Sequence, residues 1–279
     1  MRSIILKYWC LFIFCCSATL LTAQNNSLVT ADTLFKYNRT IDRQIVSFSV
    51  NPLGEIYFIN KTNQLKKFGS NGDSVGVFNE VTRYGKLSYV DARNPWRTLL
   101  YYKGFSTIVL LDKYLNVAAA LNLRKHDLYK VNAVTVSYDN NLWVYDENDQ
   151  KLKKIDQAGK VLLETNDMRT IVDEIPAPVK IIDEVGLVYL YDPAKGLYVF
   201  DTYGGYKNQL RFLNWKTIAV SGSDVYGFTD KFIYKYKKGS LDLEQYSLPI
   251  SFSGYSSVSI QNRNLYLLKD YCLYIYDLP

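Results

Sequence analysis

A pair of residues, one aliphatic and one aromatic, recurs six times along the chain at nearly regular intervals. The stretch NNLWVYDENDQKLKKIDQAGK, residues 140–160, shows the pattern most clearly: an alternating apolar run, a polar turn, a second run and another turn. The six pairs are Ile56–Tyr57, Leu100–Tyr101, Leu142–Trp143, Val188–Tyr189, Val225–Tyr226 and Leu265–Tyr266. Their aromatic members stand 44, 42, 46, 37 and 40 residues apart. Alternation with a period of two predicts strands, and a repeat of this length predicts one small sheet per copy.

Each copy has the layout of a four-stranded meander. A second apolar run starts 7 to 9 residues after each aromatic, and a shorter run such as VSFSV or TIAVS precedes the pair. A sheet this small cannot bury both of its faces alone, so copies must pack against one another. The sequence therefore predicts an all-β fold, a six-bladed β-propeller with four-stranded blades. We expect the six aromatics to fill the core between blades.

The two ends of the repeat region predict how the ring closes. The last copy stops at LYIYDLP, which is its third strand, so its fourth strand is missing. A spare strand-like segment, Leu28 to Tyr37, stands before the first copy. Pairing this N-terminal strand into the last blade would remove an open sheet edge. We therefore expect the N-terminal strand to close the ring.

The first 23 residues have the layout of a cleaved secretory signal. Arg2 and Lys7 precede an almost wholly apolar run from Tyr8 to Leu21, and LLTAQ offers a cleavage site after Ala23. A retained membrane anchor is the alternative, but the run is shorter than the ~20 residues that a spanning helix needs. We expect residues 24–279 to form the propeller domain, periplasmic or secreted, with no further transmembrane span.

Cleavage would leave Cys272 as the single cysteine, so no internal disulfide is expected. The apolar run YCLYIY around it predicts a buried, inert thiol.

The cadence of residues 140–160, with its polar turn followed by KKIDQAGK, resembles an NHL repeat. Six such units resemble the six-bladed propellers of the NHL and TolB-like type. The chain is also similar to small exported propeller proteins of Gram-negative bacteria that have no assigned activity. The resemblance covers residues 28–279 and implies a bacterial cell-envelope protein, with a fold that hosts both binding proteins and enzymes.

Catalytic chemistry has little support in the sequence. The single histidine, His126, lies in a basic segment, and neither a zinc ligand set nor a nucleophile with its base can be assembled. We expect no cofactor, no metal and no catalytic residue. The alternative is a divalent-cation-dependent hydrolase of the lactonase or esterase type. Its candidate ligands near the inner strand ends are Asp42, Asp91, Asn132 and Asp183.

A binding surface has better support. The segments between blades are the longest irregular ones, and they carry cations beside aromatics. The candidate residues for a ligand or partner are Arg83, Tyr84, Lys130, Arg169, Trp215 and Tyr255. They predict a non-catalytic binding or scaffold protein that holds an envelope protein, a peptide or an anionic glycan. The competing interpretation is a solvated basic rim without a partner. The formal net charge of +6 is spread along the chain, so no nucleic-acid partner is expected, and we expect a monomer.

Overall fold

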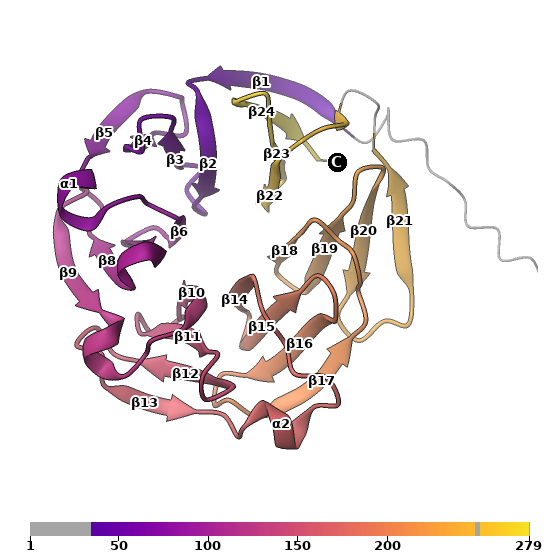
Figure 1. Cartoon of the computed structure of the whole chain (residues 1–279). Coiled ribbons are helices and arrows are strands. Elements are labelled where there is room, and N and C mark those ends of the chain that lie inside the picture. The colour runs from indigo at the N-terminus through magenta and orange to yellow at the C-terminus, as the bar shows by residue number, and fades with distance from the viewer. Residues whose placement is uncertain (1–34, 249–251, 279) are drawn as a thin grey trace, which may run out of the picture.

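The computed structural model describes residues 35–248 and 252–278, which form a ring of six four-stranded antiparallel sheets (Figure 1). The predicted six-bladed propeller is confirmed. The predicted signal sequence, residues 1–23, lies outside the described residues. Within the described part of the chain, no helix combines the length and the apolar character required to cross a bilayer.

Five blades are each built from four consecutive strands, which follow one another from the axis outward. The first three blades are β2 (Ile45–Val50), β3 (Ile56–Asn60), β4 (Leu65–Phe68) and β5 (Ser74–Phe78); β6 (Tyr89–Asn94), β7 (Arg97–Tyr102), β8 (Thr107–Leu111) and β9 (Val117–Asn122); and β10 (Val131–Val136), β11 (Leu142–Asp146), β12 (Lys151–Ile155) and β13 (Val161–Glu164). The next two are β14 (Lys180–Glu184), β15 (Leu187–Asp192), β16 (Gly196–Asp201) and β17 (Tyr206–Leu210); and β18 (Thr217–Ser221), β19 (Asp224–Phe228), β20 (Phe232–Lys237) and β21 (Leu243–Ser247).

The helical turns lie outside the sheets. The connections between blades contain α1 (Val81–Tyr84), the 3-10 helix η3 (Leu123–His126) and α2 (Met168–Ile171). A second 3-10 helix, η2 (Lys103–Phe105), joins β7 to β8. In a four-stranded meander, the connection that enters the first strand and the turn between the second and third strands lie at the same end of the blade. We call this side of the ring the connection face, and it faces the viewer in Figure 1.

The sixth blade combines both ends of the chain. It consists of β22 (Ser257–Gln261), β23 (Asn264–Lys269), β24 (Cys272–Asp277) and, as its outermost strand, β1 (Lys36–Asp42). Closure by an N-terminal strand is confirmed. The pairing extends further along the chain than the expected segment, 28–37, because it runs from Lys36 opposite Asp277 to Asp42 opposite Cys272. Residues 28–34 lie outside the described part. An outermost strand keeps most of its residues in solvent, so its sequence, KYNRTID, needs few apolar side chains.

Cys272 is half-buried, so the expectation of a fully buried thiol is wrong. Burial and the neighbouring Asp42 carboxylate both raise the pKa of the thiol. The thiol form therefore predominates at neutral pH, where a thiolate would be the reactive species.

The core lies between the blades. The buried residues form six apolar clusters, and each cluster joins two neighbouring blades. The recurring aromatic stands on the second strand of every blade and packs toward the next blade around the ring. Five of the six are buried, with Tyr57 and Trp143 wholly inaccessible, and Tyr226 is half-buried. The predicted inter-blade role of these aromatics is confirmed.

One interface contains a stack of three rings over a glycine. Trp215, in the connection between β17 and β18, lies flat between Phe212 and Tyr234, with ring centroids 4.4 and 5.4 Å away. A Cβ atom built on Gly227 of β19 would overlap the Trp215 ring. Only a residue without a side chain allows the indole to lie this close to the sheet.

The first prediction concerns the closing strand, β1. A chain that begins at Arg43 lacks β1, and we expect it to aggregate or to melt at least about 10 °C below a chain that begins at Phe35. The reason is that β24 loses its ladder partner and becomes an exposed edge. We expect the free energy of unfolding to fall by several kcal/mol, and each kcal/mol lowers the melting temperature by about 2–4 °C in a chain of this size. Calorimetry of the two chains measures the difference. Equal melting temperatures would mean that β1 does not hold the ring closed.

The second prediction concerns the stack of Trp215, Phe212 and Tyr234. Gly227→Ala should lower the free energy of unfolding by about 1–3 kcal/mol, because the added methyl must displace Trp215 from its stack. Gly104→Ala is the matched control, since nothing lies within 4 Å of a Cβ at that position. Denaturant unfolding of both variants gives the comparison. A Gly227→Ala protein as stable as the control would contradict the described packing.

Candidate functional site: the channel and the connection face

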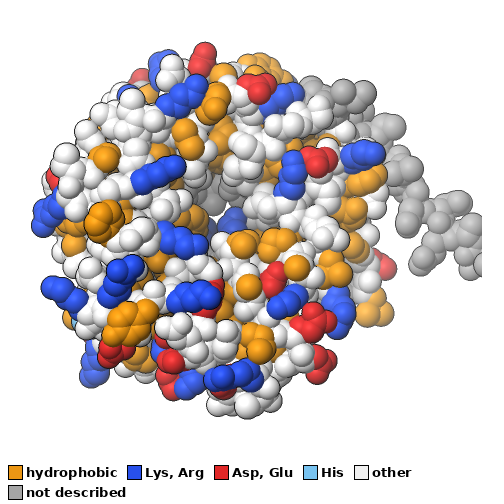
Figure 2. Space-filling view, in the orientation of Figure 1, with side chains coloured by type: hydrophobic (Ala, Val, Ile, Leu, Met, Phe, Trp, Pro, Cys, Tyr) orange, Lys and Arg blue, Asp and Glu red, His pale blue; other side chains and the backbone are white. Residues whose placement is uncertain are grey.

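The innermost strands surround a central cavity of about 280 Å³. Its lining comes from β2, β6, β14, β18 and β22, and it is rich in hydroxyl groups. The serines are Ser47, Ser49, Ser221, Ser257 and Ser259, and the charged residues are Asp91, Arg93, Lys180 and Glu184. Figure 2 shows the hollow at the centre of the ring.

Asp91, which is buried, and Arg93, which is half-buried, both lie on β6 and form an ion pair that reaches the next blade. Arg93 Nε and Nη2 donate to the two Asp91 carboxylate oxygens at 3.0 and 2.9 Å. Thr135 of β10 donates its hydroxyl to Asp91 at 2.6 Å and accepts from Arg93. Burial alone would raise the pKa of Asp91, but the Arg93 charge and these hydrogen bonds outweigh it and lower the pKa to about 2. Asp91 is therefore a permanently ionised link between two blades.

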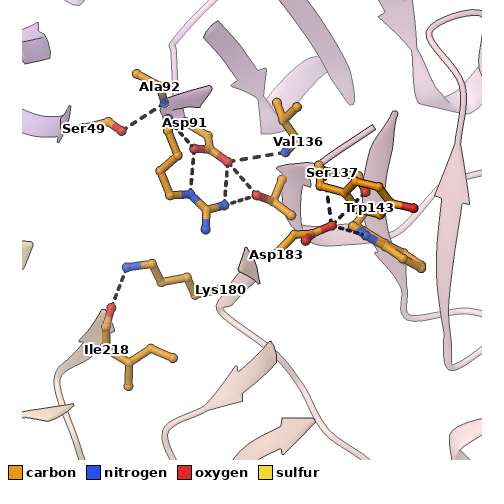
Figure 3. Close-up of polar contacts among 12 residues, drawn as sticks. Ser49, Asp91, Ala92, Val136, Ser137, Trp143, Lys180, Asp183 and Ile218 are labelled. Atoms are coloured by element: carbon orange, nitrogen blue, oxygen red, sulfur yellow. Dashed lines mark hydrogen bonds and ion pairs between the residues drawn. The ribbon is translucent and has the colours of Figure 1, made fainter. Parts of the chain in front are cut away.

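Asp183, on β14, makes an equivalent link in the opposite direction. One of its carboxylate oxygens accepts from Ser137 Oγ at 2.8 Å and from Trp143 Nε1 at 2.9 Å, both in the preceding blade (Figure 3). Two of the candidate ligands for a divalent cation, Asp91 and Asp183, are thus bound to neighbouring blades. The described residues contain no group of three or more His, Cys, Asp or Glu side chains placed to hold a metal ion.

Lys180, at the start of β14, forms no ion pair with any acid of the described residues. Its ammonium donates to the Ile218 carbonyl of β18 at 2.7 Å, and its side chain extends toward that strand (Figure 3). Burial and the charge of Arg93 lower the pKa of Lys180 to about 8. Arg93 also keeps one nitrogen, Nη1, buried without a hydrogen-bond partner. Two cations with unused donors therefore share the channel.

The predicted binding residues fall into two groups. Arg83, Lys130 and Arg169 are exposed on the connection face. Arg83 lies over the Tyr84 ring, 5.0 Å from its centroid. Lys130 pairs with Glu147 at 2.9 Å, and Arg169 pairs with its neighbour Asp167. These three residues come from three different connections, and no contact joins them.

The three aromatic candidates lie in the core. Tyr84 is 7 % exposed, Trp215 4 % and Tyr255 2 %. Tyr84 packs on Tyr102, Trp215 occupies the ring stack, and Tyr255 donates its hydroxyl to the Thr229 carbonyl at 2.8 Å. Each side chain fills a gap beside or between blades. A direct contact of these rings with a partner would require the connections to move, and their binding role stays a prediction.

The structure gathers a larger group of cations on the same face than the candidates Arg83 and Lys130 alone. They belong to the connections and turns of blades 1 to 3, and all of them are exposed. We call this group the basic crescent; it consists of Lys61, Arg83, Lys86, Lys103, Arg124, Lys125 and Lys130. Figure 2 shows Lys and Arg gathered on this side of the connection face. Glu80 and Asp127 are the acids in the connections, and the β11–β12 turn adds Glu147, which pairs with Lys130, and Asp149. Seven cations therefore face four acids, and positive charge predominates.

The neighbouring connection has the opposite character. The segment between β13 and β14 contains Asp167, Asp173 and Glu174 beside the single cation Arg169. Arg169 therefore does not extend the basic crescent, although the sequence placed it in the same candidate surface as Arg83 and Lys130. The balance of acidic and basic residues within each connection distinguishes Arg169 from Arg83 and Lys130, and it can be read from the sequence.

Solved structures with the same fold include two lyases and the β-propeller domain of another protein. A virginiamycin B lyase from Staphylococcus aureus aligns with a TM-score of 0.62 at 12% identity, over 88% of this chain and 100% of that one. A streptogramin B lyase aligns at 0.58 and 12% identity, over 88% and 97%. The propeller domain of Cps50 (Swd1) from Myceliophteria thermophila aligns at 0.61 and 10% identity, over 88% and 100%. Identities this low show the fold alone. No protein-family model and no curated protein sequence matches the chain.

The third prediction concerns the ion pair of Asp91 with Arg93. Because the pKa of Asp91 is lower in the folded chain than its usual 3.8, its contribution to stability is present above pH 3.8 and is lost as the pH falls through about 2. Asp91→Asn should cost about 2 kcal/mol or more at pH 7, and the difference from the unaltered protein should shrink toward pH 2. Denaturant unfolding at pH 7, 4 and 2.5 measures it. A difference that does not change with pH would contradict the ion-pair assignment.

Proposed function

We propose that the protein is a non-catalytic binding protein of the bacterial cell envelope, which holds an anionic partner against the basic crescent. The observation that supports this most is the clustering of exposed cations on the connections of blades 1 to 3. Six blades packed around a closed ring form a rigid support on which connections can vary without disturbing the core. Binding residues are commonly carried in this way by loops on a rigid scaffold.

The partner is best described by its charge. Exposed Lys and Arg side chains attract carboxylates over about one Debye length, ~8 Å at physiological ionic strength. A single exposed pair is worth only about 0.2–1 kcal/mol, so a partner must engage several cations at once. An anionic glycan, or an acidic peptide segment of an envelope protein, carries carboxylates at suitable spacing. Export to the periplasm or the cell surface, through the signal at residues 1–23, is part of this proposal and places the protein away from nucleic acid.

The alternative, a cation-dependent hydrolase of the lactonase or esterase type, has weaker support. Such a site needs carboxylates that are free to coordinate an ion. Asp91 is occupied by Arg93 and Thr135, and Asp183 by Ser137 and Trp143. The two lyases share the fold, and a shared fold does not transfer an activity. Membership in the NHL or TolB-like type is likewise part of the proposal.

The fourth prediction tests the crescent. The purified chain should bind polygalacturonate, polyglutamate or both at low salt, and affinity should fall steeply toward 0.5 M NaCl. A variant with Arg83→Glu, Lys86→Glu and Lys125→Glu should bind at least about tenfold more weakly, because three attractive contacts become repulsive. Among residues 35–248 and 252–278, none of the three has an ion-pair partner that the change would release. Biolayer interferometry with the immobilised polymers measures the affinities.

A matched control separates the crescent from net charge. Lys113→Glu, Lys237→Glu and Lys238→Glu change the charge by the same amount on exposed lysines at the opposite ends of the blades. This control should retain most of the binding. If both triple variants lost affinity for the polymers equally, binding would depend on net charge alone and the role of the basic crescent would be refuted. Failure of the unaltered protein to bind either polymer would refute the proposal.

A further inference from the structure

We propose that the central channel is a second binding site, which takes a small oxyanion, a phosphate or a carboxylate, between Lys180 and Arg93. This site is independent of the basic crescent, because it lies among the inner strands and involves none of the crescent residues. It also differs from the cation site considered above, since its free groups are donors rather than acceptors.

The two cations have donors left after their structural contacts are made. An ammonium carries three N–H groups, and Lys180 gives one of them to the Ile218 carbonyl. Arg93 uses Nε and Nη2 on Asp91 and Thr135, which leaves Nη1 buried and unpaired. A buried donor without a partner is costly, by about 1–3 kcal/mol. An oxyanion that bonds to Nη1 and to the Lys180 ammonium would satisfy both groups.

The surrounding cavity suits such a ligand. One water molecule needs only about 10–15 Å³ of comparable space, so about 280 Å³ holds a phosphate or a small carboxylate with several waters. Serines of β2, β18 and β22 line the cavity opposite β6 and β14. Hydroxyl groups donate to oxyanions as well as to water, so these strands can complete a ligand shell that the cations begin.

The charges around Lys180 favour an incoming anion. Arg93 of β6 repels the Lys180 ammonium, and Asp91 of β6, already bound by Arg93, compensates only in part. Tyr89 of β6 faces the same cavity, and burial raises the pKa of its phenol, so it stays neutral. Asp183 and Glu184 are the acids on the same strand as Lys180, and Asp183 is bound to the preceding blade. Glu184 lies four residues from Lys180, about 13 Å between Cα atoms along β14. Its carboxylate interacts with Arg93 and offsets part of the guanidinium charge. The channel-facing residues of β2, β18 and β22 carry no charge.

The experiment measures thermal stability against anion concentration at pH 7 and constant ionic strength. Sodium phosphate and sodium acetate replace sodium chloride stepwise, in separate series, so that the two oxyanion classes are distinguished. A ligand that binds only the folded chain raises the melting temperature in a saturable way. We expect a saturable rise with at least one of the two anions. A melting temperature that does not respond to either anion beyond chloride would overturn the proposal.

Variants of Lys180 assign the site. Lys180→Gln keeps a donor for the Ile218 carbonyl but removes the charge, and it should raise the midpoint concentration at least about tenfold. Lys180→Arg keeps the charge and should retain binding within a few-fold. Lys237→Gln, on an exposed lysine of β20, removes the same charge far from the channel and should leave the midpoint unchanged. An unchanged midpoint in Lys180→Gln would show that the anion binds elsewhere and would refute this assignment.

The pH dependence gives an independent readout. An anion bound beside Lys180 favours the protonated amine, so affinity should be highest below about pH 8 and should fall as the pH rises through 8 to 10. The Lys180→Arg variant should not show this fall, because a guanidinium remains charged throughout the range. A fall of equal size in both proteins would assign the pH effect to another group and would count against the role of Lys180.

Discussion

The pairing of β1 with β24 is the contact on which the whole ring depends. Each blade buries its apolar faces only when it has a neighbour on both sides, and the sixth blade is complete only when the N-terminal strand docks. The register joins Lys36 to Asp277, two positions at opposite ends of the described chain. Contacts of this sequence separation form late, because the entropy of closing a long loop must be offset first. The six inter-blade clusters are therefore coupled to one strand.

Near the axis, polar contacts join the blades in addition to the apolar clusters. The links run in order around five blades: Ser49 to Ala92, Asp91 to Thr135, Trp143 to Asp183, and Lys180 to Ile218. The channel charges thus have a structural role first. A ligand can bind only to hydrogen-bond donors that the links between blades do not use, and these donors belong to Lys180 and Arg93.

The spacing of the aromatics was enough to predict the number of blades, the strands per blade and the place of each aromatic. It was not enough to place β1, because an outermost strand has no strong apolar pattern. Tyr84, Trp215 and Tyr255 were predicted at a binding surface since they stand in irregular segments. In the structure these segments fold back over gaps beside the blades, and their rings fill those gaps. Burial in a connection depends on tertiary contacts that a local pattern does not contain.

The two proposed sites use charge in different physical settings. The basic crescent is exposed, so salt screens it and many weak contacts must act together. Lys180 and Arg93 are half-buried in the channel, where screening is weaker than at the outer surface and each hydrogen bond to an anion is stronger. Asp91 fixes the guanidinium of Arg93, and Ile218 orients the ammonium of Lys180. Because the fold already holds both cations in place, an anion in the channel would bind with little further loss of side-chain entropy.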